Sequence, residues 1–127
     1  MKRLQAIYGK HSVDIYFQYD ATKQLSTLID TSNRYVIITD NNVWQIYSES
    51  FIQQIPNILD IIVIPVGELS KSMDYYQQII QQLQRIHFHR NDYLIALGGG
   101  VVGDLTGFIA STYLRGVPYI QIPSSLS

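Results

Sequence analysis

The sequence predicts an α/β fold of the Rossmann-like kind, with a mostly parallel sheet and helices on both of its faces. Three observations support this prediction. Short apolar runs alternate with amphipathic stretches, the runs are continuous, and one of them passes directly into a glycine-rich segment at 98–103. Continuous apolar runs are typical of strands buried on both faces, and strand–helix alternation indicates parallel strands joined by right-handed crossovers.

The first element is expected to be a β-hairpin. Two short runs of β-type residues, 5–8 and 13–17, are separated by a turn at 9–12. Asp20 then stands where a helix N-cap is expected, because apolar residues follow it at helical spacing. These apolar residues are Ala21, Leu25, Leu28 and Ile29.

The next strand is predicted at 35–38, where an apolar run is closed by Thr39 and Asp40. Asn41 or Asn42 is expected to cap the following helix, and Pro56 to stop it. The helix should bury one apolar side, made of Val43, Ile46, Tyr47, Phe51 and Ile55.

The same alternation continues to the end of the sequence. A second buried strand is predicted at 61–64, a third at 93–97 and a fourth at 119–122. Ser70 is expected to open a long helix with one apolar side and a solvated glutamine-rich side. The apolar side consists of Met73, Tyr76, Ile79, Ile80, Leu83 and Ile86. A further helix should run from about Asp104 to Leu114, before Gly116 and Pro118.

Composition narrows the classes of function. The 127 residues suit one domain, and the formal net charge of −1 gives no case for nucleic acid or an anionic membrane as partner. The absence of cysteine excludes disulfides, thiolate zinc sites and cysteine nucleophiles. No apolar stretch has the length of a membrane span or the pattern of a signal peptide, so a cytoplasmic protein is expected.

The glycine-rich segment predicts a phosphate site. Gly98, Gly100 and Gly103 form a G-x-G-x-x-G pattern after a strand and at the start of a helix. Glycines let the backbone approach a pyrophosphate, and the helix N-terminus offers free N–H groups and partial positive charge. The alternative interpretation is a turn that only packs closely.

One part of the usual dinucleotide pattern is missing. An acidic residue about 20 positions downstream normally binds the ribose, yet 105–127 contains no acid. Asp40 and Glu68 are candidates for this role, since both follow predicted strands. Asp104 would repel a phosphate, so it should either cap its helix or bind a polar group at the nicotinamide end.

Taken together, these segments resemble 3-dehydroquinate synthases. The central signature is the segment 98–104, followed by Gly107, Phe108, Ala110, Tyr113, Arg115 and Gly116. Upstream, 39–43 and 65–71 match two further signatures in the right order, and 121–126 resembles a segment that usually contains Pro-Thr-Thr-Leu. The resemblance spans about residues 35 to 126.

The resemblance implies a role for each matching residue. The cofactor would be NAD, with Asp40 and Asn42 near its adenosine and Glu68 and Lys71 at the adenosine ribose. The backbone of Gly99, Gly100 and Val101 would contact the pyrophosphate, and Asp104 would lie at the nicotinamide end. Ser124 and Ser125 would replace two threonines that contact the cofactor. Arg115 would bind the substrate phosphate across a homodimer. The alternative for Arg115 is a cation that complements a helix C-terminus.

The family reaction would convert 3-deoxy-arabino-heptulosonate 7-phosphate to 3-dehydroquinate and phosphate, with NAD and a divalent metal, zinc or cobalt. In the family, the metal ligands and most substrate-binding lysines lie in a C-terminal helical domain that the 127 residues lack. His11, His87 and His89 are not expected to be ligands. The hypothesis is therefore an NAD-binding chain, 1–127, without catalytic or metal residues of its own. A related sugar-phosphate cyclase, a metal-dependent polyol dehydrogenase and a non-catalytic nucleotide-binding module are the alternatives.

Overall fold

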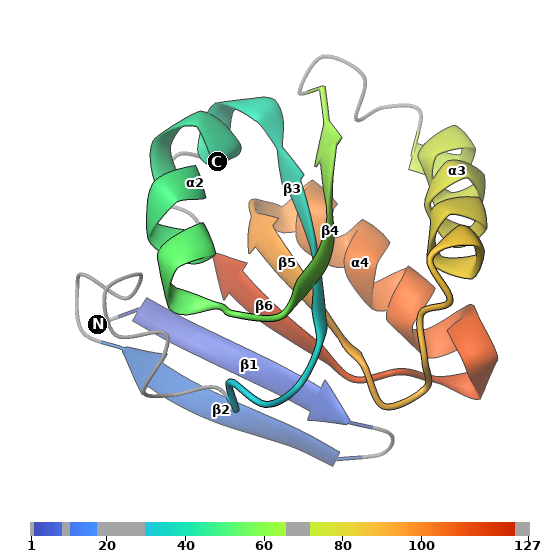
Figure 1. Cartoon of the computed structure of the whole chain (residues 1–127), viewed down its shortest axis with the longest axis horizontal. Helices are drawn as coiled ribbons and strands as arrows, with labels where there is room; N and C mark the ends of the chain where they lie inside the picture. The colour runs from blue at the N-terminus through green and yellow to red at the C-terminus, as the bar shows by residue number, and fades with distance from the viewer. Residues whose placement is uncertain (1, 9–10, 18–29, 66–71, 124–127) are drawn as a thin grey trace.

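A computed structural model describes residues 2–8, 11–17, 30–65 and 72–123. Its centre is a six-stranded sheet with the strand order β2-β1-β6-β5-β3-β4 (Figure 1). This arrangement confirms the predicted α/β class. In the described ranges no helix combines the length and the apolar character that crossing a bilayer would need.

The predicted hairpin is present. β1 (Lys2–Tyr8) and β2 (His11–Phe17) pair antiparallel, and Tyr8 lies opposite His11. β1 also pairs antiparallel with β6 (Tyr119–Pro123), which joins the hairpin to the rest of the sheet. The helix expected after Asp20 lies outside the described residues.

Four strands are parallel. They are β3 (Tyr35–Asp40), β4 (Ile58–Ile64), β5 (Tyr93–Gly98) and β6. The chain leaves β3 for β4 on one side and then returns to β5 on the other side of β3. The strand order therefore reverses between β3 and β5, and the carboxyl ends of open α/β sheets bind ligands at such a switch point.

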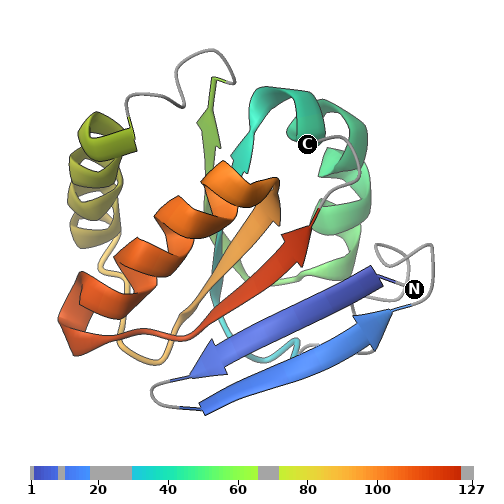
Figure 2. The ribbon, with the colours of Figure 1, turned by 180° about the vertical axis from the view of Figure 1, so that it is seen from behind.

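Helices cover both faces of the sheet, as predicted. α2 (Asn41–Gln54) lies on one face, and α3 (Ser72–Arg85) and α4 (Gly100–Thr112) lie on the other (Figure 2). The side chains of each strand point alternately to the two faces, so β3 contributes Tyr35 and Ile37 to the α2 side and Val36 and Ile38 to the α3–α4 side.

Two helix starts differ from the prediction. Asp40, not Asn41 or Asn42, is the N-cap of α2, because its carboxylate accepts a hydrogen bond from the Val43 N–H. α4 begins at Gly100 rather than near Asp104, so the glycine-rich segment forms its first turn. α4 ends at Thr112, and a short 3₁₀ turn, η2 (Tyr113–Arg115), follows it.

Two apolar residues assigned to buried helix sides are exposed. Ile46 is 61% exposed, because Phe51 places the centre of the buried side of α2 further round the helix than Val43 alone would. Met73 is 65% exposed in the first turn of α3, beside α4. The centres of the apolar sides were predicted correctly, since Ile79 and Leu83 of α3 are buried.

Candidate functional site

The carboxyl ends of β3 and β5 form the switch-point edge of the sheet. Thr39 of β3 pairs with Leu97 of β5, and the Thr39 hydroxyl donates a 2.7 Å hydrogen bond to the Leu97 carbonyl. Thr39 is fully buried. This bond joins the ends of two strands that are far apart in sequence, and it fixes the positions of the residues that follow each strand.

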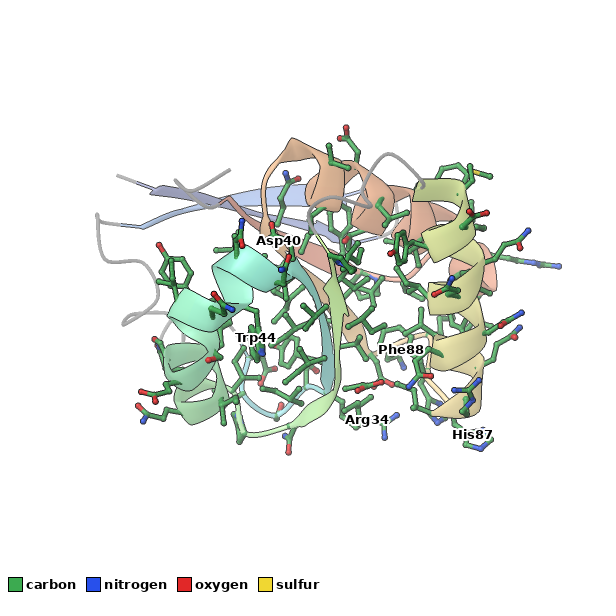
Figure 3. All side chains as sticks on the ribbon, turned by 90° about the horizontal axis from the view of Figure 1, so that it is seen from above. Arg34, Asp40, Trp44, His87 and Phe88 are labelled. Carbon is green, nitrogen blue, oxygen red and sulfur yellow. The ribbon has the colours of Figure 1, made fainter. Side chains whose placement is uncertain are left out.

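Asp40 is the acidic residue at this edge, where it begins α2 (Figure 3). Its Oδ1 atom accepts a 2.8 Å hydrogen bond from the Val43 N–H, and its side chain is buried. Its Oδ2 atom lies 3.4 Å from the position that a Cβ on Gly98 would occupy. One carboxylate oxygen therefore caps α2 while the other faces the end of β5.

The glycine turn after β5 is open where a phosphate would enter. Gly98 has φ +150°, a conformation that side-chain-bearing residues rarely adopt. The N-cap of α4 is Gly99. Because glycine has no side chain, it cannot cap the N–H groups of the first turn. A Cβ placed on Gly100 would meet no atom of the described residues within 4 Å.

The first turn of α4 has donors to offer. The Gly103 N–H closes that turn on the Gly99 carbonyl at 3.0 Å. The backbone N–H groups of Gly100 and Val101 precede it and have no acceptor within the helix. Free N–H groups at a helix N-terminus, together with the helix dipole, bind anions such as phosphate.

The third glycine of the motif serves packing. A Cβ on Gly103 would stand 2.5 Å from the Gln121 Nε2 atom, and one on Gly107 would stand 3.0 Å from the Tyr119 hydroxyl. These two glycines therefore let α4 approach β6 closely. The close-packing interpretation is correct for Gly103, whereas the space around Gly100 is open.

Asp104 is exposed on α4 and is not its N-cap, so the capping alternative is wrong. Burial and then the negative charge of the Asp104 carboxylate raise the pKa of the Tyr119 hydroxyl. Asp104 also lines a groove of about 290 Å³ between α3 and α4, whose other lining residues are Met73, Tyr76, Val101, Leu105 and Phe108.

Of the remaining predicted cofactor residues, Asn42 lies within the described segments and the other four do not. Asn42 is exposed in the first turn of α2, two positions after Asp40. Glu68, Lys71, Ser124 and Ser125 lie outside the described residues. Pro123, directly before Ser124 in sequence, pairs with Gly98 at the switch-point edge.

Arg115 lies at the opposite edge of the sheet. It is exposed in η2, beyond the C-terminus of α4. The 13 residues of α4 extend for about 20 Å. The fold therefore brings together Asp40 and the Gly99–Val101 turn, and it separates Arg115 of the same chain from them.

His87 and His89 lie at that opposite edge as well. His87 follows α3 and has φ +57°. The Phe88 N–H donates to the Leu83 carbonyl at 2.9 Å, and the His87 N–H donates to the Gln84 carbonyl at 3.2 Å. This is the Schellman ending of a helix. His87 and His89 are both exposed. Within the described ranges, no three His, Asp or Glu side chains gather closely enough to hold a metal ion.

Sequence reasoning missed two residues that shape this edge. The sequence analysis places both residues in a strand or at its end and in a family motif, without a role of their own. In the structure Thr39 joins β3 to β5, and Gln121 packs against Gly103 where α4 meets β6. A polar residue within an otherwise apolar strand was the available signal for both.

Comparison of the sequence with known families gives one clear match. Residues 61–127 match the model of the 3-dehydroquinate synthase N-terminal family. The 3-dehydroquinate synthase of Staphylococcus aureus (strain Newman) is 37% identical over 126 residues, which cover 98% of this chain and 35% of that protein. The 3-dehydroquinate synthase of Latilactobacillus sakei subsp. sakei (strain 23K) is 46% identical over 93 residues, which cover 71% of this chain and 26% of that protein. The chain thus spans about a third of the length of these curated relatives.

Solved structures share the fold. A crystal structure of 2-deoxy-scyllo-inosose synthase matches with a TM-score of 0.75 at 19% identity, covering 95% of this chain and 35% of that one. ValA, a 2-epi-5-epi-valiolone synthase from Streptomyces hygroscopicus subsp. jinggangensis 5008, solved with NAD+ and Zn2+ bound, matches with a TM-score of 0.65 at 26% identity. That match covers 82% of this chain and 29% of ValA.

Proposed function

Because this chain belongs to the 3-dehydroquinate synthase family, we propose that it forms the NAD-binding part of such an enzyme. The observation that carries the proposal is the open N-terminus of α4 at Gly99 and Gly100, beside the buried carboxylate of Asp40 at the switch point. This edge offers backbone donors to an anion and an acidic acceptor next to them, which are the two groups that a dinucleotide needs.

The pyrophosphate of NAD would lie over the first turn of α4. The backbone N–H groups of Gly99, Gly100 and Val101 would donate to its oxygens, and the space above Gly100 accommodates the approach. The structure fits this group because a side chain at position 100 would fill the open space. A chain of nearly neutral net charge thereby binds an anion through a local arrangement of dipoles.

The two ends of the cofactor would extend to either side of this turn. Asp40 and Asn42 would lie near the adenosine, and Glu68 and Lys71 would bind its ribose. On the other side, Asp104 would address the nicotinamide end. Ser124 and Ser125 would supply hydroxyl groups from the segment after β6, where the described chain ends beside Gly98.

The whole enzyme would convert 3-deoxy-arabino-heptulosonate 7-phosphate to 3-dehydroquinate and phosphate. NAD, when bound, supplies a reversible acceptor for a hydride. The divalent metal, zinc or cobalt, and most substrate contacts would come from the part of such enzymes that is not contained in these 127 residues. The 127-residue chain would therefore bind NAD in the cytoplasm without turnover, and nucleic acid and membranes are not among its proposed partners.

Arg115 would bind the substrate phosphate of a neighbouring subunit. The length of α4 separates it from the NAD edge of its own chain by about 20 Å. An arginine suits this role because its planar guanidinium binds phosphate through two parallel hydrogen bonds. The proposed homodimer would thus be part of the site.

Calorimetry with NAD tests the binding proposal. Saturable binding by the 127-residue chain is expected, with affinity reduced at least tenfold in Glu68→Ala and Lys71→Ala. Glu49→Ala on the exposed side of α2 is the matched control and should bind like the parent. Absence of saturable binding, or equal affinity in all variants, would contradict the proposal. An assay with substrate, NAD and zinc tests the proposal that this chain has no turnover of its own. Measurable turnover by the 127-residue chain would overturn that proposal.

A related sugar-phosphate cyclase is the second candidate, and the fold match to 2-deoxy-scyllo-inosose synthase favours keeping it. The two candidates share the proposed NAD edge and differ in substrate. Assays of the corresponding full-length enzyme with 3-deoxy-arabino-heptulosonate 7-phosphate and with the substrate of 2-deoxy-scyllo-inosose synthase would distinguish them.

A further inference from the structure

The sheet divides at the switch point, and Thr39 stands at the division. Along β3 and β5, the last residues that lie opposite each other are Thr39 and Leu97. The residues that follow pair in opposite directions, Asp40 with β4 and Gly98 with β6. The two strands therefore remain joined as far as Thr39 and separate directly after it.

The two halves of the proposed NAD site lie on opposite sides of this division. Asp40 leads from β3 into α2, and the turn at Gly99–Val101 leads from β5 into α4. The two helices cover opposite faces of the sheet (Figure 2), with the strands between them. The ends of β3 and β5 therefore determine how the first turns of the two helices are placed relative to each other.

The Thr39 hydroxyl bridges the two strands at this point. Its Oγ1 atom lies 2.7 Å from the Leu97 carbonyl oxygen on β5 and 3.5 Å from the Asp40 carbonyl oxygen of its own strand. The residue is 0% exposed, so the bond to Leu97 is shielded from water. A hydrogen bond in such surroundings is electrostatically stronger than one at the surface. Thr39 thus ties the strands together at the last position where they are adjacent.

Apolar burial alone does not explain a threonine here. The three residues before it, Val36, Ile37 and Ile38, are aliphatic and fully buried. Valine has nearly the shape of threonine and suits a strand that is covered on both faces. A buried hydroxyl carries a desolvation cost that its hydrogen bond must offset. The benefit of threonine at this position therefore lies in the bond to Leu97 and in the geometry that the bond imposes.

We propose that Thr39 is a positioning residue of the NAD site. Its bond to Leu97 holds the ends of β3 and β5 at the separation that lets the Asp40 carboxylate and the donors of the Gly99–Val101 turn engage one NAD molecule together. The inference rests on the proposed function and adds to it a buried residue that acts through Asp40 and the glycine turn. Two contacts on one ligand reinforce each other only when the geometry allows both at once, so the NAD affinity should depend on this separation.

Calorimetry with NAD on a pair of Thr39 variants tests the proposal. Thr39→Val keeps the shape and loses the hydroxyl, so the NAD affinity should fall about fivefold or more, the factor that one net hydrogen bond is worth. Thr39→Ser keeps the hydroxyl and loses a buried methyl group, so it should melt at a lower temperature than the parent and keep the parental NAD affinity.

Ile37→Val is the matched control, because it also removes a methyl group from a fully buried position of β3. Its melting temperature should fall, and its NAD affinity should stay at the parental value. A purely structural role of Thr39 would instead lower the NAD affinity in step with the melting temperature in all three variants.

The outcomes separate this inference from the proposed function. A parent chain without saturable NAD binding would contradict the proposed function, and this inference with it. If the parent binds NAD and Thr39→Val binds it equally well, the positioning role is overturned and the proposed function stands. The positioning role is also overturned if Thr39→Ser loses as much NAD affinity as Thr39→Val, since the hydroxyl would then not be the group that matters.

Discussion

The carboxylate of Asp40 faces Gly98 across the switch point. Its Oδ2 atom lies 3.4 Å from the position that a Cβ on Gly98 would occupy. These residues end two parallel strands that are adjacent in the sheet but separated in the chain by β4 and two helices. The acid thus lies beside the glycine turn, although 105–127, where a ribose-binding acid would normally follow the turn, contains none. This relationship supports an upstream source for the acidic part of the proposed NAD site.

Asp40 combines a capping role with its proposed cofactor role, and two substitutions separate them. Asp40→Ala removes the acceptor of the Val43 N–H and should lower the free energy of unfolding by about 1 kcal/mol. Asp40→Asn retains a capping oxygen and should stay within about 0.5 kcal/mol of the parent, because asparagine caps helices as well as aspartate does. Urea denaturation measures both. If the two variants are equally destabilised, the cap is not what Asp40 contributes to stability.

The glycine turn gives a pair of alanine substitutions with opposite expected effects on stability. Gly98→Ala should destabilise the fold by about 1–3 kcal/mol, since φ is +150° and Val102 atoms lie 3.4 Å from the new Cβ. Gly100→Ala should be neutral or stabilising by up to about 1 kcal/mol, because the new Cβ meets no atom of the described ranges within 4 Å and alanine favours helix.

The same pair tests where the pyrophosphate binds. Gly100→Ala should weaken NAD binding at least tenfold in calorimetry despite its undiminished stability, because the methyl group fills the proposed phosphate space. A Gly100→Ala chain with parental NAD affinity would show that the cofactor does not approach α4 here.

His87 occupies a left-handed position at the end of α3 that usually holds glycine. His87→Gly should therefore raise the free energy of unfolding by about 0.5–1 kcal/mol. His89→Gly, two residues later and equally exposed, is the control and should bring no gain. Thermal or urea unfolding at pH 7 measures the free energy of unfolding of both variants and the parent. A destabilised His87→Gly variant would contradict the Schellman ending assigned to α3.

Tyr35 makes stability depend on alkaline pH. Its buried hydroxyl donates a 2.6 Å hydrogen bond to the Asp30 carbonyl, and burial raises its pKa to about 12. The unfolded chain loses this proton near pH 10, so the folded state binds more protons above that pH and stability falls as the pH rises from about 10 to 12. Tyr35→Phe should be less stable than the parent at pH 8 and lose less stability between pH 9 and 11. Parallel pH dependence in the two proteins would exclude this role for Tyr35.

The sequence was sufficient for the elements whose burial is set by continuous apolar runs. β3 and β5 were predicted because strands covered on both faces are apolar at every position. The sequence alone did not determine where α2 begins, because Asp40, Asn41 and Asn42 are all favourable N-cap residues. The N-cap is Asp40 because β3 ends there. The Thr39–Leu97 bond depends on which strands become neighbours, and no local pattern contains that information. The position of Arg115 likewise follows from the direction of α4 across the sheet and not from its motif.

The most direct test of the account is an NMR titration of the isotope-labelled chain with NAD. The account predicts that the amide resonances of Gly99, Gly100 and Val101 shift most, together with that of Asp40. The amides of His87 and Phe88, at the opposite edge of the sheet, should remain in place. Shifts confined to that opposite edge, or none at millimolar NAD, would contradict the central claim that this chain binds NAD where β3 and β5 end.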